Sequence, residues 1–324
     1  MDIPPHIFQA FTLPPVQAVS PIGSGLLHAT YHVVTAAGSW VLQKLHPAIP
    51  DAAVEDMQVV TSYLASCGLR VPLLVRTRDA QPLARDASGG RWRLYAWIAG
   101  QVVEAVPHAA MAYEAGHLVG RLHRALAGLA YQPRGSIPHF HETAVVLAEL
   151  RQVAVQLPVA LRQVAEAILT DLPALIIIDN APQLIHGDLK ISNLIFDQDG
   201  HAIGLIDFDT ILLQARAIDL GDALRSWCNR TAEDDPQACF DLSFFDAAVQ
   251  GYAEGAHAVN TAAARQLYRR ATRQMALELS ARFLIDVVRD SYFGFDATRY
   301  PNRRAHNTAR ALGQYHLAGT IPRI

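Results

Sequence analysis

The chain has 324 residues, of which 51 % are hydrophobic and 18 % are charged. So large an apolar share excludes a mainly disordered chain, and the length predicts about two domains. Lys and Arg number 27 against 30 Asp and Glu, for a formal charge of −3. A protein that neutralises a nucleic-acid backbone normally has a basic excess, so we expect no nucleic-acid partner.

The apolar runs are short, as at residues 175–178, and none approaches the ~20 residues of a membrane span, so we expect no membrane partner. The first residues lack a basic stretch followed by an apolar one, so we expect no secretory signal. The cysteines, Cys67, Cys228 and Cys239, form no CxxC pair, which is typical of a reducing compartment. These features predict a cytoplasmic protein, as a monomer or a homodimer.

The first hundred residues predict strands and one helix. Residues 29–34 and 39–45 are apolar or β-branched and are separated by Ala36-Ala37-Gly38, which predicts a hairpin. Apolar residues at helical spacing predict a helix over 51–66 that stops at Cys67-Gly68. Further strands are expected at 73–75 and 92–98.

Beyond Gly100 the apolar period becomes helical, and a loop-rich stretch with short strands at 183–209 interrupts it. Helices are expected over 109–128, 142–155, 158–170, 217–229, 243–254, 261–289 and 302–318. This order predicts an α+β, bilobal fold. A small β-rich N-lobe over residues 1–99 would join a larger, mainly helical C-lobe over residues 100–324.

The chemistry is carried by the segment LIHGDLKISNLIF at 184–196 and by GLIDFDT at 204–210. Asp188 precedes Asn193 by five residues, and Asp207 follows Asn193 by fourteen, behind an apolar strand. This spacing matches the kinase catalytic loop H-x-D-L-x-x-x-N and the Asp of D-F-G. Phosphoryl transfer needs a carboxylate to take the acceptor proton, and oxygen ligands for Mg²⁺ at the nucleotide phosphates. We predict Asp188 as the catalytic base, Asn193 and Asp207 as Mg²⁺ ligands, and ATP as the co-substrate.

Two further regions are candidates for nucleotide binding. Gly23 and Gly25 precede a strand, where glycines let backbone N–H groups approach phosphates. Ala96 and Ile98 lie at the junction of the two lobes, where backbone groups would bind adenine.

A strand lysine is the usual partner of the α- and β-phosphates in kinases. Lys44 is the candidate here, although its neighbour Gln43 is an alternative that would face the nucleotide instead. On the helix over 51–66, Glu55, or else Asp56, would orient Lys44.

The motif HGDLKxSNLIF followed by IDFDT resembles the aminoglycoside phosphotransferase and choline kinase superfamily, which has Gly where protein kinases usually have Arg. The segments WVLQ, FHET and AIDLGDALR are similar to the N-acetylhexosamine 1-kinase branch, as are RFLID, YF and YP near the C-terminus. The resemblance extends from about Val16 to Leu317. It implies a kinase-like fold and phosphorylation of an amino- or N-acetyl-hexosamine at the anomeric hydroxyl.

The same resemblance implies an acceptor site. It places Arg282 and Tyr292 against the acceptor, together with Asp209 and Arg225 from the two motifs. An alternative for Arg282 is an ion pair with Asp286 at i,i+4 on its own helix. Asp209 replaces the glycine of D-F-G, so it is also a candidate for supporting the metal, because the crowded carboxylates need cations.

Other polar residues of these segments have structural interpretations. Asp219 and Asp222 are expected to cap a helix or to brace the catalytic loop, and His186 to hydrogen-bond the loop backbone. His123, His139 and His141 lack the spacing of zinc ligands. Trp227 is expected in the core, with a place in the acceptor pocket as the alternative.

Several functions remain open from the sequence. Within the superfamily the acceptor is an amino sugar, an aminoglycoside, choline or homoserine. A non-catalytic nucleotide-binding protein of kinase fold is disfavoured, because Asp188, Asn193 and Asp207 are all present. A protein kinase is disfavoured because no A-P-E motif follows Asp207.

Overall fold

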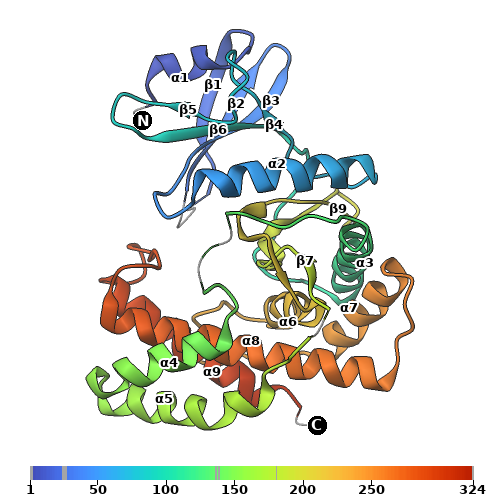
Figure 1. Cartoon of the computed structure of the whole chain (residues 1–324). Coiled ribbons are helices and arrows are strands. Elements are labelled where there is room, and N and C mark those ends of the chain that lie inside the picture. Colours follow the sequence, from blue (N-terminus) through green and yellow to red (C-terminus); the bar gives the residue numbers. More distant parts are fainter. Residues whose placement is uncertain (1–2, 24–27, 136, 138, 180, 323–324) are drawn as a thin grey trace.

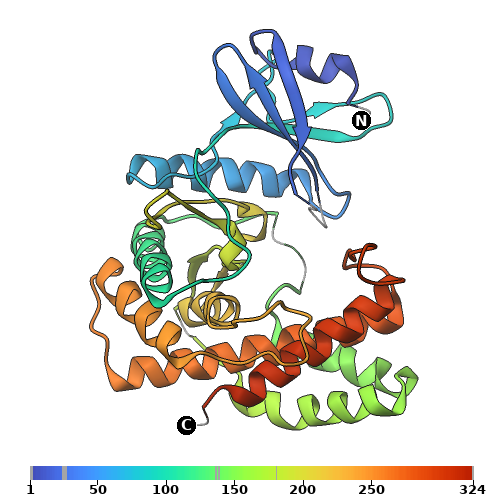
Figure 2. The ribbon, with the colours of Figure 1, turned by 180° about the vertical axis from the view of Figure 1, so that it is seen from behind.

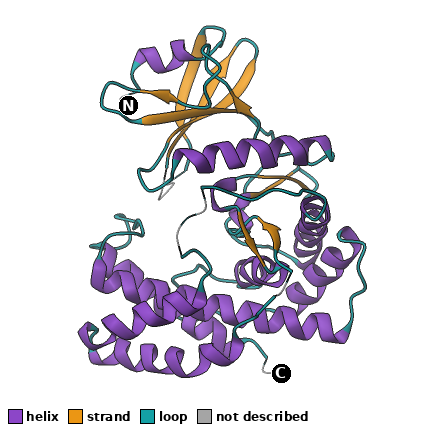
Figure 3. Ribbon diagram, viewed as in Figure 1, coloured by secondary structure: helices purple, strands orange, loops and turns teal. Residues whose placement is uncertain are grey.

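The structure of the chain is a computed structural model that describes residues 3–23, 28–135, 137, 139–179 and 181–322. Its strands are concentrated in the N-terminal region and its helices in the C-terminal region (Figures 1 and 3). The expected α+β arrangement, with strands first and helices after them, is therefore confirmed. No helix within the described ranges is long and apolar enough to cross a membrane.

The N-terminal region is an antiparallel sheet with a helix on each side of it. The sheet has the order β1-β2-β3-β6-β4, and β5 also pairs with β6. Its elements are α1 (Pro5–Ala10), β1 (Val16–Pro21), β2 (Ala29–Thr35), β3 (Gly38–Lys44), α2 (Asp51–Ser66), β4 (Leu74–Val75), β5 (Ala84–Arg85) and β6 (Arg91–Ala96).

The two faces of the sheet follow from the alternation of side chains along each strand. One face packs Leu42 and Trp92 against Ile7 of α1. The other face turns Tyr95 toward Met57 of α2, which runs beneath the sheet (Figure 1). A residue of β3 or β6 therefore points either to α1 or to α2.

The C-terminal region is a set of helices built around α8. Its helices are α3 (Ala109–Leu126), α4 (Thr143–Val153), α5 (Val159–Asp171), α6 (Arg216–Trp227), α7 (Leu242–Gly255), α8 (Ala262–Arg289) and α9 (Arg303–Thr320). Helices α3 and α7 approach each other so closely that a Cβ on Gly116 or on Gly251 would overlap the backbone of the other helix.

Between the sheet and these helices lie two short antiparallel strand pairs and two 3₁₀ turns. β7 (Gln183–Ile185) pairs with β10 (Leu212–Gln214), and β8 (Leu194–Phe196) pairs with β9 (Ala202–Leu205). The turns are η3 (Ile191–Asn193) and η4 (Phe208–Thr210). Asn193 ends η3, Asp207 directly precedes η4, and Asp188 lies in the loop between β7 and η3.

The connection between the two regions is visible from behind, where the chain descends from the sheet after β6 (Figure 2). Gln101 and Phe196 exchange two backbone hydrogen bonds, of 2.7 and 2.8 Å, so this segment is fastened to β8. Gly100 has φ +156°, and a Cβ there would overlap Ile195. The predicted strand over 92–98 ends at Ala96, because the chain leaves the sheet at that point.

Candidate active site

The catalytic loop begins where β7 ends, and α6 holds it from below. The Asp219 carboxylate accepts the backbone N–H groups of His186, at 2.9 Å, and Gly187, at 2.8 Å. It also lies 2.9 Å from Nε2 of His123. Asp219 is completely buried. Its predicted role in bracing the loop is confirmed.

His186 joins the catalytic loop to the segment that carries Asp207. Its Nε2 lies 2.9 Å from the carbonyl oxygen of Ile206, which only accepts, so Nε2 carries the proton. Its Nδ1 accepts the backbone N–H of Asp188 at 3.3 Å. The imidazole is therefore a scaffold, as expected.

Asp188 and Asn193 lie side by side. The Nδ2 of Asn193 donates to the backbone carbonyl of Asp188 at 2.8 Å and to its Oδ2 at 3.0 Å. Both donors of the amide are thus engaged, which leaves its oxygen as the remaining polar atom. The Nζ of Lys190 lies 2.6 Å from Oδ2 of Asp188. Burial alone would raise the pKa of Asp188, but the Lys190 ammonium outweighs it and lowers this pKa.

Asp207 has an unusual backbone, and its carboxylate makes no hydrogen bond or ion pair with the described residues. Its φ of 68° and ψ of 60° are left-handed, a conformation that Asp tolerates better than most residues. Burial raises its pKa, and the carboxylates of Asp209 and Asp188 raise it further; the nearby Lys190 ammonium lowers it but does not outweigh them. A carboxylate without a hydrogen-bond partner and an amide oxygen that accepts no hydrogen bond from the described residues fit a Mg²⁺ ion at Asp207 and Asn193.

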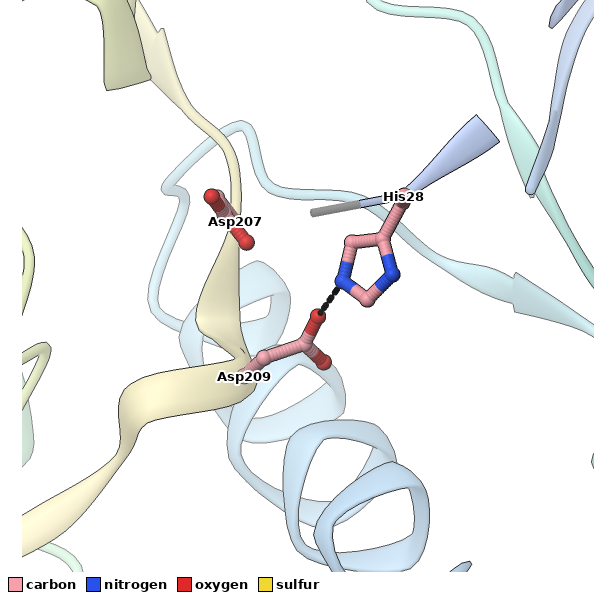
Figure 4. Close-up of side chains that lie close together, drawn as sticks. All are labelled: His28, Asp207 and Asp209. Atoms are coloured by element: carbon pink, nitrogen blue, oxygen red, sulfur yellow. Dashed lines mark hydrogen bonds and ion pairs between the residues drawn. The ribbon is translucent and has the colours of Figure 1, made fainter. Parts of the chain in front are cut away.

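Asp209 lies close to Asp207, but its carboxylate points to His28 and is already paired (Figure 4). Its two oxygens accept from the guanidinium of Arg93 at 2.5 and 2.6 Å, and His28 Nε2 lies 2.9 Å from Oδ2. Burial would raise the pKa of Asp209, but Arg93 and His28 hold it well below its usual range. Ligand atoms of His28, Asp207 and Asp209 come within 4.8 Å of one another. Because Arg93 occupies Asp209, this geometry does not support the predicted acceptor or metal role of Asp209.

The prediction for Lys44 is not supported. Its ammonium lies 3.4 Å from Asp86 and stands over the Trp92 ring, on the α1 face of the sheet. Successive residues of a strand face opposite ways, so Gln43 points to the α2 face instead. Gln43 donates to Thr30 Oγ1 at 3.1 Å and accepts from Arg93.

The acidic residues of α2 do not meet Lys44 either. Glu55 is exposed and pairs with Arg134 at 2.6 Å. Asp56 accepts the backbone N–H groups of Arg134 and Gly135, at 2.8 and 2.6 Å. Both carboxylates therefore hold the segment after α3, and the strand lysine–helix glutamate pair is not formed.

The other nucleotide-binding predictions concern backbone positions. Gly23 has φ +60° and borders a cavity, whereas Gly25 lies outside the described residues. The N–H of Ala96 donates to Leu73 at 3.2 Å. In the described part of the chain nothing bonds the backbone N–H or carbonyl of Ile98, so Ile98 retains free groups.

A cavity of about 470 Å³ opens between the sheet and the loop before α9. On the sheet side it is lined by Pro21, Gly23 and the residues from His28 to Tyr31, and on the loop side by Gly294, Phe295, Asp296 and Ala297. His28 lines this cavity and also lies 2.9 Å from Asp209, so one residue connects the cavity wall with the η4 turn.

Arg282 lies on α8, and three aromatic rings surround its guanidinium. Its guanidinium carbon lies 5.0 Å from the Phe140 ring, 5.6 Å from Tyr292 and 5.5 Å from Phe293. Among the described residues it has no hydrogen-bond or ion-pair partner. The alternative pair with Asp286 is wrong, because Asp286 instead accepts the backbone N–H groups of residues 291–293. The donors of the Arg282 guanidinium are therefore not used by the described residues.

Arg225 differs from Arg282. It is 6 % exposed, and its guanidinium donates to Asp222 at 2.8 and 3.0 Å, to Glu233 at 3.3 Å and to Gln314 at 3.1 Å. The acceptor role predicted for Arg225 is not supported by these contacts. Trp227 is fully buried and donates to the carbonyl of Leu189 at 2.9 Å, which confirms its place in the core.

Comparison with known families now decides the relationship. The model of the phosphotransferase enzyme family matches residues 18–278, which include the sheet, the catalytic loop and most of α8. The chain belongs to this family.

This phosphotransferase-family chain is similar to homoserine kinases. It is 32 % identical over 219 residues to that of Pseudomonas aeruginosa, a match that covers 65 % of each chain. The homoserine kinase of Granulibacter bethesdensis is 26 % identical over 64 % of each chain. The match therefore spans just under two thirds of the length of these curated relatives.

Solved structures show the same fold at low identity. An amicoumacin kinase in complex with AMP-PNP, Ca²⁺ and Ami superposes with a TM-score of 0.63 at 14 % identity, over 95 % of this chain and 91 % of that one. An aminoglycoside phosphotransferase from Alicyclobacillus acidocaldarius gives 0.61 at 15 % identity, over 99 % and 96 %.

The sequence analysis missed two site residues of this family member, Lys190 and Arg93, and named His141 without its partners. Lys190 is separated from Asp188 by one residue, a spacing that puts both on one side of an extended loop. His141 lies 2.7 Å from the carbonyl of Gly187 and 3.2 Å from Glu278. The FHET motif pointed to His141, but nothing local indicated its partners. Arg93 belongs to no recognised motif. Only the strand register, which pairs Arg93 with Gln43, shows that its side chain points to the α2 face.

Proposed function

We propose that the protein is an ATP-dependent kinase that transfers the γ-phosphate to a hydroxyl group of a small acceptor. The observation that carries this is the grouping of three residues: Asn193 donates to Asp188, and the Asp188 carboxylate lies near enough to Asp207 to raise its pKa. The sheet side, over residues 1–99, would bind the nucleotide. Residues 100–324 would supply the catalytic loop, the metal ligands and the acceptor pocket.

Each residue has a role that follows from its contacts. Asp188 is kept ionised by Lys190, so it can take the proton of the acceptor hydroxyl as the phosphoryl group arrives. The Asn193 amide steers the Asp188 carboxylate and offers its oxygen, with the carboxylate of Asp207, to Mg²⁺. When bound, Mg²⁺ neutralises charge on the transferring phosphates. The free backbone groups of Ile98 are suited to adenine.

The first candidate acceptor is an amino- or N-acetyl-hexosamine, phosphorylated at the anomeric hydroxyl. A sugar needs fixed polar groups beside an apolar or aromatic wall. Arg282, with unused donors among Phe140, Tyr292 and Phe293, supplies both. A polycationic aminoglycoside would meet an unpaired guanidinium there, which disfavours it.

Homoserine is the second candidate, because the homoserine kinase of Pseudomonas aeruginosa is 32 % identical over 219 residues. The structure offers this acceptor a specific contact as well. A guanidinium with free donors binds a carboxylate through two parallel hydrogen bonds, so Arg282 would hold the homoserine carboxylate.

One panel separates these acceptors. ADP release is measured with Mg²⁺-ATP and, in separate reactions, N-acetylglucosamine, glucosamine, L-homoserine, choline and kanamycin, with Asp188→Asn as the background control. The proposal expects acceptor-dependent ADP release with a sugar or with homoserine. Release that no acceptor stimulates above the Asp188→Asn background would contradict it.

A further inference from the structure

The sheet carries a buried cation on β6 rather than on β3. Gln43 and Arg93 are direct cross-strand partners, so both side chains point to the α2 face. Lys44, the cation of β3, points to the opposite face and pairs with Asp86. Position 43 thus faces inward with a neutral amide, and the charge stands directly opposite it.

Arg93 is 1 % exposed, and all its nitrogens contact protein groups. Nε and Nη2 donate to Oε1 of Gln43 at 3.0 and 2.8 Å. Nη1 and Nη2 donate to the two oxygens of Asp209 at 2.5 and 2.6 Å. Nη1 also lies 3.8 Å from Sδ of Met57 on α2. The guanidinium is therefore built into the protein and does not serve as a ligand of the phosphates.

Asp209 is the point that this cation fixes. It belongs to the η4 turn, and the residue before that turn is Asp207, with its left-handed backbone. His28 of the sheet region adds a third bond: its Nδ1 accepts the N–H of His46 at 3.1 Å, so its Nε2 is the nitrogen that donates to Asp209. The turn next to the metal carboxylate is held from two places in the N-terminal region.

We infer that Arg93 is a positioning residue that fastens the metal-binding turn directly to the N-terminal sheet. This inference rests on the proposed kinase function. In protein kinases a strand lysine and a helix glutamate must pair before the site is complete. Here the Arg93–Asp209 pair connects β6 of the sheet to the η4 turn beside Asp207, and Gln43 aligns the guanidinium of Arg93. Helix α2 contributes Met57 at this point, while Glu55 and Asp56 hold another segment.

Direct binding tests this without knowledge of the acceptor. Calorimetric titration with ATP, in the presence of Mg²⁺ and in its absence with EDTA, is carried out on the unaltered chain and on Arg93→Gln, Arg93→Lys and Asp209→Asn. We expect Arg93→Gln and Asp209→Asn to lose on the order of tenfold or more in Mg²⁺-ATP affinity, while binding of metal-free ATP stays within about twofold. Arg93→Lys retains the charge and should recover part of the loss.

Two further variants distinguish positioning from general destabilisation. Gln43→Lys combined with Arg93→Gln moves the cation to the facing strand position and should bind Mg²⁺-ATP more tightly than Arg93→Gln alone. Lys44→Gln removes the cation of the other face and should leave the affinity unchanged. Thermal unfolding without nucleotide checks that each variant is folded, and Asp209→Asn provides the test if Arg93→Gln is not.

The outcomes are separable. The inference is overturned if Arg93→Gln binds Mg²⁺-ATP as tightly as the unaltered chain does. If only Asp209→Asn folds, the same result in that variant overturns it. Equal losses with and without Mg²⁺ also overturn it, since they indicate a structural role alone. If the unaltered chain binds no Mg²⁺-ATP, the proposed function fails, and this inference fails with it.

Discussion

Asp188 meets two donors, the Lys190 ammonium and the Asn193 amide, and these favour its ionised form. If Asp188 takes the acceptor proton, the isosteric change Asp188→Asn removes the base and leaves the fold intact. We expect turnover to fall by roughly 10²–10⁴-fold. Mg²⁺-ATP affinity should be retained, as measured by titration. A variant with near-normal turnover would exclude Asp188 from this role.

Asp207 has a carboxylate that makes no hydrogen bond or ion pair with the described residues, and burial raises its pKa. Bound Mg²⁺ would neutralise it, so Asp207→Ala should abolish the Mg²⁺-dependent part of ATP binding. Calorimetry at several Mg²⁺ concentrations measures this. Asp199→Asn, in an exposed acidic turn, is the control and should bind as the unaltered chain does. Unchanged Mg²⁺-ATP affinity in Asp207→Ala would contradict the assignment.

Arg282 has unused donors among three rings, so its loss should affect the acceptor and not the nucleotide. Arg282→Ala would leave acceptor hydroxyl or carboxylate groups unpaired, at about 1–3 kcal/mol in transition-state binding. The measurement is kcat/KM for the best acceptor of the panel, beside the affinity for ATP. Tyr292→Phe tests the adjacent hydroxyl. If neither variant changes kcat/KM by more than about twofold, the acceptor binds elsewhere.

At the scale of single residues, the sequence predicted site residues that lie close together along the chain. It did not predict contacts between residues that are far apart in the sequence. Asp188, Asn193 and Asp207 were found because one loop carries them at a known spacing. The prediction for Lys44 is not supported by its place on the α1 face, and the sequence left Gln43 open because composition cannot say which face of a strand meets the cleft. Arg93 and Asp209 are 116 residues apart, and no local pattern connects them.

Among the elements, the long helices were the best predicted. The helix expected over 51–66 is α2 itself, and the helix expected over 261–289 differs from α8 by one residue at its start. Their apolar period extends over many turns. The short elements α1, β5 and β10 were not predicted, because two to six residues carry too little periodicity and are stabilised by tertiary contacts.

The contact between α3 and α7 yields a prediction about stability. A methyl group at Gly251 would overlap the carbonyl of Tyr113, so Gly251→Ala must push the two helices apart. Such overpacking destabilises by about 1–3 kcal/mol. Gly319→Ala on α9 meets no atom, and should stabilise by about 0.4–1 kcal/mol because it restricts the unfolded chain. Chemical denaturation of both variants measures the difference, and equal effects would contradict the close packing.

At the scale of the whole molecule, His141 ties the segment before α4 to α8 and to the catalytic loop. Its two ring nitrogens face only acceptors, the Gly187 carbonyl and the Glu278 carboxylate, so the buried ring is favoured in its doubly protonated form. Burial alone would lower the pKa of His141, but Glu278 outweighs it and raises this pKa above 6.5. Thr143 also donates to Glu278. The three segments therefore share one buried ion pair.

This pair makes stability depend on pH in a definite direction. Because the folded pKa of His141 is raised, its contribution is fully present below about pH 6.5 and is lost as the pH rises through the folded pKa. Glu278, with a lowered pKa, contributes above its ordinary 4.5 and loses that contribution as the pH falls through its folded pKa.

Removing one partner of a buried pair costs about 3–5 kcal/mol. We expect His141→Gln to destabilise most near pH 6 and least near pH 9, by denaturation at several pH values. Glu278→Gln removes the charge partner of His141, so the loss of stability with rising pH should be absent in that variant. A destabilisation by His141→Gln that is constant or grows with pH would show that the ring is neutral in the folded protein.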